Sequence, residues 1–177
     1  MPYWKLSDNE KTQLKAWWRW LDENRGDRAV LRRASSPDDI LLSPSFSKFF
    51  NQMPASWLGG ERIQYADAAM VAAVVARIKN HSDKHSFAKT LAVLSGDKTK
   101  SPLSELRFTQ LQKSPTEQEV FTRICRAIQM LGGKTNVVSI TEDILQWLLE
   151  FRQGHARKPQ QRLAVRWAND YYANLKD

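Results

Sequence analysis

The chain has 177 residues, 42% of them hydrophobic, including seven tryptophans. This is enough apolar material for one compact core or two small ones, which excludes a disordered basic tail. Lysine and arginine total 27 against 19 aspartates and glutamates, a net charge of +8. Because such an excess attracts polyanions, nucleic acid is the first partner to consider.

Membrane insertion is not expected, because the longest nearly apolar run is too short. Residues 66–78 contain Asp67 and Arg77, and a membrane-spanning helix needs about 20 apolar residues. The N-terminal segment lacks the pattern of a secretory signal, so we expect a cytoplasmic protein. The single cysteine, Cys125, is expected to be a semi-buried core residue without a disulfide or a metal, and we expect no cofactor.

The first half of the chain has helical rather than strand periodicity. Ser7 and Glu10 have the spacing of a capping box at the start of an amphipathic helix. Asp27 is expected to cap a second helix that runs to Ala34, and serine-proline pairs at 36–37 and 43–44 predict two short ones. A long helix from about residue 61 to residue 79, apolar around most of its circumference, is expected to be central.

The second half repeats this pattern, with predicted helix starts at Ser101-Pro102, at Ser114-Pro115-Thr116-Glu117 and at Thr141. The last helix is predicted from about Pro159 to Leu175. Val137 and Val138 suggest extended chain, but no second strand-like run offers a partner. We therefore predict an all-α protein with two small helical subdomains that form an elongated helical bundle, divided at the Ser95–Lys100 linker into residues 1–97 and 98–177.

Catalytic chemistry has little support in the sequence. There is no phosphate-binding glycine loop and no nucleophile motif, and most carboxylates stand at predicted helix starts, where the helix dipole favours them. His81 and His85 have metal-ligand spacing for a helix, but the polar residues around them favour a loop and no third ligand is evident. We therefore expect neither an enzyme nor a metal site.

The arginines and lysines are more informative, because they recur at helical spacing beside apolar stripes. On the predicted last helix, Lys158, Arg162 and Arg166 occur at every fourth residue. Arg123 and Arg126 lie three residues apart on another predicted helix, although Glu119 is placed to pair with Arg123. Guanidinium groups bind phosphate oxygens in a bidentate manner, so these faces are candidate nucleic-acid contacts, although solvated basic faces are also common.

The seven tryptophans include candidates for base stacking, but most fall on apolar stripes and are expected in the core. Trp20 and Trp57 are the exceptions, and we expect them at the surface, where either of them is also suited to a protein interface.

Five segments together resemble the CasB family, the small subunit of the type I-E CRISPR Cascade complex. They are residues 29–34 (AVLRRA), 36–39 (SPDD), 86–91 (SFAKTL), 105–108 (ELRF) and 166–172 (RWANDYY). Their order and spacing extend over most of the chain.

The resemblance implies a non-catalytic helical subunit that forms a head-to-tail homodimer inside a guide-RNA-bound complex. Its partners would be the other Cascade subunits, the guide RNA, and the target and displaced DNA strands, which basic surface residues would help to hold apart. Arg32, Arg33 and Arg107 lie within the matching segments and are the strongest candidates, followed by Lys89.

Two other functions stay open. A helical adaptor that binds only protein would use its cations for solubility and Trp20 and Trp57 as interface anchors, so its associations would be insensitive to salt. An independent helix-turn-helix regulator would need a recognition helix with short polar side chains, and no segment stands out as one.

Overall fold

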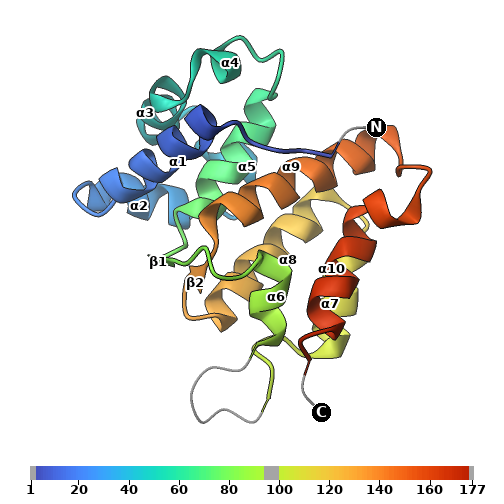
Figure 1. Ribbon diagram of the computed structural model, residues 1–177. Helices are drawn as coiled ribbons and strands as arrows, with labels where there is room; N and C mark the ends of the chain where they lie inside the picture. Colours follow the sequence, from blue (N-terminus) through green and yellow to red (C-terminus); the bar gives the residue numbers. More distant parts are fainter. Residues whose placement is uncertain (1–2, 94–99, 176–177) are drawn as a thin grey trace.

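The computed structural model describes residues 3–93 and 100–175 (Figure 1). It is 64% helical, which confirms the predicted all-α class. The α-helices are α1 Asp8–Trp20, α2 Arg25–Arg32, α3 Pro44–Gln52, α4 Ala55–Leu58, α5 Tyr65–Val75, α6 Phe87–Ala92, α7 Glu105–Gln112, α8 Glu117–Met130, α9 Val137–Gln153 and α10 Leu163–Tyr172. Two 3-10 turns, η1 Pro37–Ile40 and η2 Pro159–Gln161, and the strands β1 Asn80–His81 and β2 Lys134–Thr135 complete the described elements.

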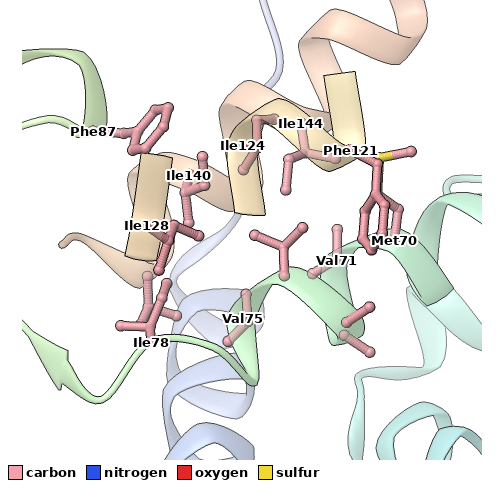
Figure 2. Close-up of a cluster of buried hydrophobic side chains, with 14 of the residues drawn as sticks. Met70, Val71, Val75, Ile78, Phe87, Phe121, Ile124, Ile128, Ile140 and Ile144 are labelled. Atoms are coloured by element: carbon pink, nitrogen blue, oxygen red, sulfur yellow. The ribbon is translucent and has the colours of Figure 1, made fainter. Parts of the chain in front are cut away.

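Helix α5 is the centre of the fold. Every residue from Asp67 to Val75 is buried, and the helix packs against α2, α3, η1, α8 and α9. Figure 2 shows its side chains meeting those of α8 and α9, with Phe87 at the edge of the cluster. A helix that is apolar around its whole circumference must be covered on all sides, so the predicted central position of this helix is confirmed. The helix is nevertheless shorter than the predicted 61–79.

The buried cluster includes residues from before and after the predicted domain boundary, among them Val71 of α5 and Ile144 of α9. Most of the predicted linker, residues 95–99, lies outside the described residues. The division into two subdomains stays a prediction.

Helix α1 starts with the predicted capping box. The Ser7 hydroxyl accepts from the Glu10 amide at 3.2 Å, and the Glu10 carboxylate accepts from the Ser7 amide at 2.8 Å. The same carboxylate is buried and also accepts from Trp57 Nε1 and Arg62 Nε. Trp57 is completely buried, so its prediction as a surface aromatic is wrong, whereas Trp20 is half-buried.

The N-terminal segment before α1 is fastened to the C-terminal half of the chain. The Trp4 amide donates to the Gln146 side chain at 2.9 Å, and the Leu6 amide donates to the Glu142 carboxylate at 3.1 Å. The guanidinium of Arg166 lies 3.3 Å from the ring centroid of Tyr3. Residues 3–6 therefore form an arm across α9 and α10, which Figure 1 shows as the extended segment beside α9.

Several helix starts differ from the predicted ones. Asn24 precedes α2, so Asp27 lies within the helix. Ser104 caps α7 and Thr116 caps α8, in place of Ser101 and Ser114. The reason is that several residues able to cap precede each helix, and tertiary packing selects among them.

Helix α9 starts at Val137, four residues before the predicted cap at Thr141. The Asn136 side chain accepts from the Ser139 amide at 2.9 Å and caps the helix. Thr141 is buried inside it and donates to the Val137 carbonyl. Val137 and Val138 are therefore helical, and the short parallel pairing of β1 with β2 lies just before them.

The predicted last helix is interrupted. Pro159 starts η2, and Arg162 has extended backbone angles, φ −80° and ψ 136°, before α10 begins at Leu163. Lys158, Arg162 and Arg166 therefore do not share a helix face, and the predicted row of cations is wrong.

Within residues 3–93 and 100–175, no helix combines the length and the apolar character needed to cross a bilayer.

Candidate nucleic-acid interface

Three adjoining surface hollows line one side of α8. The first has a volume of about 520 Å³ and lies between α8 and the ends of α2 and α5. The second, of about 470 Å³, lies between α7 and α8 and shares Arg126 and Gln129 with the first. The third, of about 220 Å³, lies beside β2 and shares Met130 with the second. Together they form what we call the basic groove.

The lining of the basic groove is strongly cationic. No aspartate or glutamate is among the described residues that line it, and its cations are Arg32, Arg77, Lys79, Lys84, Arg107, Arg123, Arg126 and Lys134. Arg32 lies at the end of α2, Arg107 on α7, and Arg123 and Arg126 on α8. The fold thus brings together residues from distant parts of the sequence and produces a positive potential along a concave surface, where the field is strongest.

Arg77 links the end of α2 to the segment after α5 in the first hollow. Its guanidinium donates to the carbonyls of Arg32 at 2.8 Å and Ala34 at 2.7 Å, and also to its own helix at Ala73. It also lies 5.3 Å from the ring centroid of Phe121. Carbonyls at a helix C-terminus lack intrahelical partners, so Arg77 satisfies the end of α2 and fixes the position of Arg32 relative to α8.

A glycine turn forms the floor beside Lys79. Gly133 has φ +78°, and a Cβ atom there would lie 3.0 Å from Lys79 Cγ. The Gly133 carbonyl accepts from the Lys79 amide at 2.7 Å. Only glycine fits at position 133 without strain, and its lack of a side chain lets the aliphatic part of Lys79 pack over the turn.

Arg32 and Arg126 are the cations best placed for a ligand. Both are exposed, and among the described residues neither side chain forms an ion pair or a hydrogen bond. Arg107 is also exposed, and its guanidinium contacts Met130 Sδ at 3.2 Å. Arg123 is more restrained, because it donates to the Gln110 carbonyl at 2.7 Å and has Glu119 at 4.0 Å.

The other predicted contacts lie outside the basic groove. Arg33 and Lys158 are exposed and Lys89 is half-buried on α6. Arg162 donates to the carbonyls of Ala156 and Arg157. Arg166 lies over Tyr3, and burial lowers the pKa of its guanidinium. The structure therefore gathers Arg32, Arg107, Arg123 and Arg126 and separates the remaining predicted residues from them.

Four groove cations were missed in the sequence: Arg77, Lys79, Lys84 and Lys134. Arg77 interrupts an apolar run, and an isolated cation in such a run is a usable signal of a structural anchor. Lys79 and Lys84 lie in the connections on either side of β1, and Lys134 lies in β2. Helical periodicity does not predict this pairing.

The cation Arg152 has an internal role. It donates to both oxygens of Asp67 at 2.8 and 2.7 Å and lies 2.9 Å from Glu117. These contacts join α9 to α5 and α8 and raise the pKa of Arg152, chiefly through the hydrogen bonds to Asp67. Its charge is therefore compensated.

The ring of His81 has a structural role. His81 Nδ1 accepts from the Val137 amide at 3.1 Å, at the start of α9. Burial lowers the pKa of His81, which favours the neutral ring that this acceptor role requires. Within the part of the chain that the structure describes, no group of three or more histidines, cysteines, aspartates or glutamates is arranged to hold a metal.

Cys125 is half-buried, as predicted, and lines the first hollow. Burial raises the pKa of its thiol to about 11. A thiol with this pKa is a poor nucleophile at neutral pH.

Comparison with known proteins identifies one family. A family model described as CRISPR-associated protein Cse2 matches residues 27–172, which include every element from η1 to α10 and all cations of the basic groove. Searches of curated proteins and of solved structures returned no match.

Proposed function

This chain belongs to the Cse2 (CasB) family, the non-catalytic small subunit of the type I-E CRISPR Cascade complex, and we propose that its basic groove binds the nucleic-acid backbone there and stabilises the R-loop. The observation that carries this proposal is the lining of the groove, which combines eight cations from six parts of the fold with no described acid. Solvated basic faces usually include several acidic residues that pair with the cations, whereas among the described residues the one acid paired with a groove cation is Glu119, 4.0 Å from Arg123.

The energetics of R-loop formation give such a groove a useful role. Exchange of a DNA duplex for an RNA–DNA hybrid is nearly balanced, so backbone contacts of modest strength favour the open state. Phosphate contacts carry no sequence information, and the guide RNA supplies it by base pairing. Arginines and lysines along a groove are suited to this sequence-neutral task.

The proposal includes the partners that such a role requires. The other Cascade subunits and the guide RNA would surround the chain, a second copy would form a homodimer with it, and the target and displaced strands would be the ligands. Arg33, Lys89, Lys158, Arg162 and Arg166 stay predicted contacts to these partners, outside the basic groove.

The test compares charge-matched variants in assembled Cascade. The variant Arg32→Ala/Arg107→Ala/Arg126→Ala removes exposed groove cations. The control Lys5→Ala/Arg19→Ala/Arg25→Ala removes the same charge from exposed positions that line none of the three hollows. We expect the groove variant to lower DNA affinity and shorten the R-loop lifetime, and to reduce the salt slope of binding by about 2, at about 0.7 for each phosphate contact to a single strand.

Equal affinity and R-loop lifetime for the groove variant, the control and the unmodified protein would refute the proposal. Helical circular dichroism verifies that each variant is folded.

The alternative of an adaptor that binds only protein has lost one of its two anchors, because Trp57 is buried in the core. Association of the chain with its neighbours that is insensitive to salt, combined with no effect of the groove variant on DNA, would favour it.

A further inference from the structure

A second concave feature, which shares no lining residue with the basic groove, lies between the end of α7, the C-terminal half of α9 and the start of α10. It has a volume of about 590 Å³, within the range of about 300–1,000 Å³ that is typical of small-molecule sites. Aromatic rings from Trp147, Phe151 and Trp167 line it. We call it the aromatic cleft.

One wall of the aromatic cleft offers a flat surface. Phe151 is 48% exposed, although it is a large apolar residue. Its ring stacks on Trp147 with a centroid distance of 5.0 Å and an interplanar angle of 12°. Trp147 thus covers one face of Phe151 and holds its orientation, while a large part of the ring stays accessible. Such a supported ring is a platform for stacking.

The interior of the cleft contains a buried carboxylate with spare acceptor capacity. Glu150 is 6% exposed, and both of its oxygens accept from the Leu163 amide at 3.2 Å. The exposed ring of His155 lies nearby, with 3.5 Å between its Nδ1 and Glu150 Oε1. A carboxylate has about four lone-pair sites, so a ligand that donates a hydrogen bond is favoured here.

The rim of the cleft carries the opposite charge. Lys113 lines it and is exposed. This cation suits a phosphate outside the cleft and disfavours a cationic peptide. The cleft also adjoins the basic groove, because Arg123 of the groove donates to the hydroxyl of Ser114, which lines the cleft, at 3.2 Å.

We propose that the aromatic cleft binds an unpaired nucleobase that carries an exocyclic amino group, while the backbone of the same strand continues into the basic groove. The base stacks on Phe151, its amino group donates to Glu150, and Lys113 lies near its phosphate. This inference rests on the proposed function, since it concerns an unpaired part of the same nucleic acid.

The experiment uses the full chain and single-stranded oligonucleotides that contain 2-aminopurine, an amino-bearing base whose fluorescence is quenched by stacking. We expect binding to quench the fluorescence. Phe151→Leu should abolish the quenching and weaken binding by between about fivefold and a hundredfold, since one base–aromatic stack contributes on that scale. Tyr172→Leu is the matched control, because Tyr172 is similarly exposed, at 46%, and does not line the cleft.

The role of Glu150 is tested separately with pyrimidine homopolymers. Oligo-dC should bind more tightly than oligo-dT of the same length, because cytosine has an amino group and thymine has none. Glu150→Gln keeps an acceptor for the Leu163 amide but removes the charge. It should therefore reduce the ratio of the affinity for oligo-dC to the affinity for oligo-dT. Equal binding of both homopolymers by the unmodified chain would overturn the role of Glu150.

The outcomes separate this inference from the proposed function. If binding depends on salt and on Arg107 and Arg126, but Phe151→Leu is indistinguishable from the unmodified chain, the cleft proposal fails and the groove proposal stands. If the chain shows no salt-dependent binding, both fail. If Phe151→Leu leaves oligonucleotide binding intact and instead prevents copurification with the other Cascade subunits, the cleft is a protein-docking site and this inference is wrong.

Discussion

Asp143 provides the sharpest test of the energetics of the core. This carboxylate lies on α9, and its contact in the core is Trp167 Nε1, which donates to it at 2.9 Å. Its pKa is raised to about 7, chiefly by burial and to a lesser extent by the nearby carboxylates of Glu142 and Asp170. The hydrogen bond from Trp167 acts in the opposite direction but does not outweigh burial.

The raised pKa makes stability fall as the pH rises. Between pH 4 and pH 7 the folded protein keeps the Asp143 proton, while the unfolded chain, with a pKa of about 3.9, has released it. The contribution of Asp143 to the free energy of unfolding is present in full below pH 4 and is lost as the pH approaches 7. The loss is about 1.4 kcal/mol for each pH unit, or about 4 kcal/mol across the interval.

The substitution Asp143→Asn removes the ionisation and keeps an oxygen that can accept from Trp167. Urea unfolding from pH 4 to pH 8 should show the variant gaining stability relative to the unmodified protein by about 4 kcal/mol up to pH 7, and no further gain above it. The absolute offset at pH 4 also contains any cost of burying the second amide hydrogen, so the change with pH is the diagnostic quantity.

Glu61→Gln is the control, because it makes the same carboxyl-to-amide change at an exposed position. Its stability curve should run parallel to that of the unmodified protein. A parallel curve for Asp143→Asn as well would refute the assignment of a protonated, buried carboxyl group.

Three further substitutions test individual contacts. Arg77→Met removes the donors to the end of α2 and should destabilise the fold by about 1–3 kcal/mol in urea unfolding; an unchanged midpoint would contradict the anchoring role. Gly133→Ala places a Cβ atom against Lys79 at φ +78° and should lower the free energy of unfolding by about 1–2 kcal/mol, measured as a lower Tm. Gly132→Ala is the control, because Gly132 has a similar φ and its Cβ would have no atom within 4 Å, so it isolates the backbone part of that loss. Arg152→Ala leaves Asp67 largely buried without its bidentate partner and should cost about 2 kcal/mol, and Asp67→Asn/Arg152→Ala should recover part of it in a double-mutant cycle.

The sequence predicted the helical class and the central helix because apolar periodicity reports burial directly. The Ser7 and Glu10 capping box was also readable, since both partners lie within one turn. The starts of α8 and α9 were not, because their caps compete with nearby residues that are chemically equivalent. The choice between them depends on packing with segments far along the chain.

The candidate interface was predicted only in part. Arg32, Arg107, Arg123 and Arg126 do meet in the basic groove, but helical periodicity cannot show that α2, α7 and α8 share one surface. Helical periodicity also gave a wrong prediction at Pro159. A short 3-10 turn begins there in place of the expected α-helix, so Lys158 is not on a common helix face with Arg166. Trp57 was mispredicted because its partner, Glu10, lies 47 positions away.

The arm formed by residues 3–6 has a consequence for synthesis of the protein. Its backbone donors at Trp4 and Leu6 find their acceptors 142 and 136 positions later. Contacts of such separation close last, since the intervening polypeptide must first be ordered. During synthesis, residues 3–6 emerge from the ribosome long before α9 and must wait for it before they can dock, so this segment reaches its native place later than much of the chain made after it.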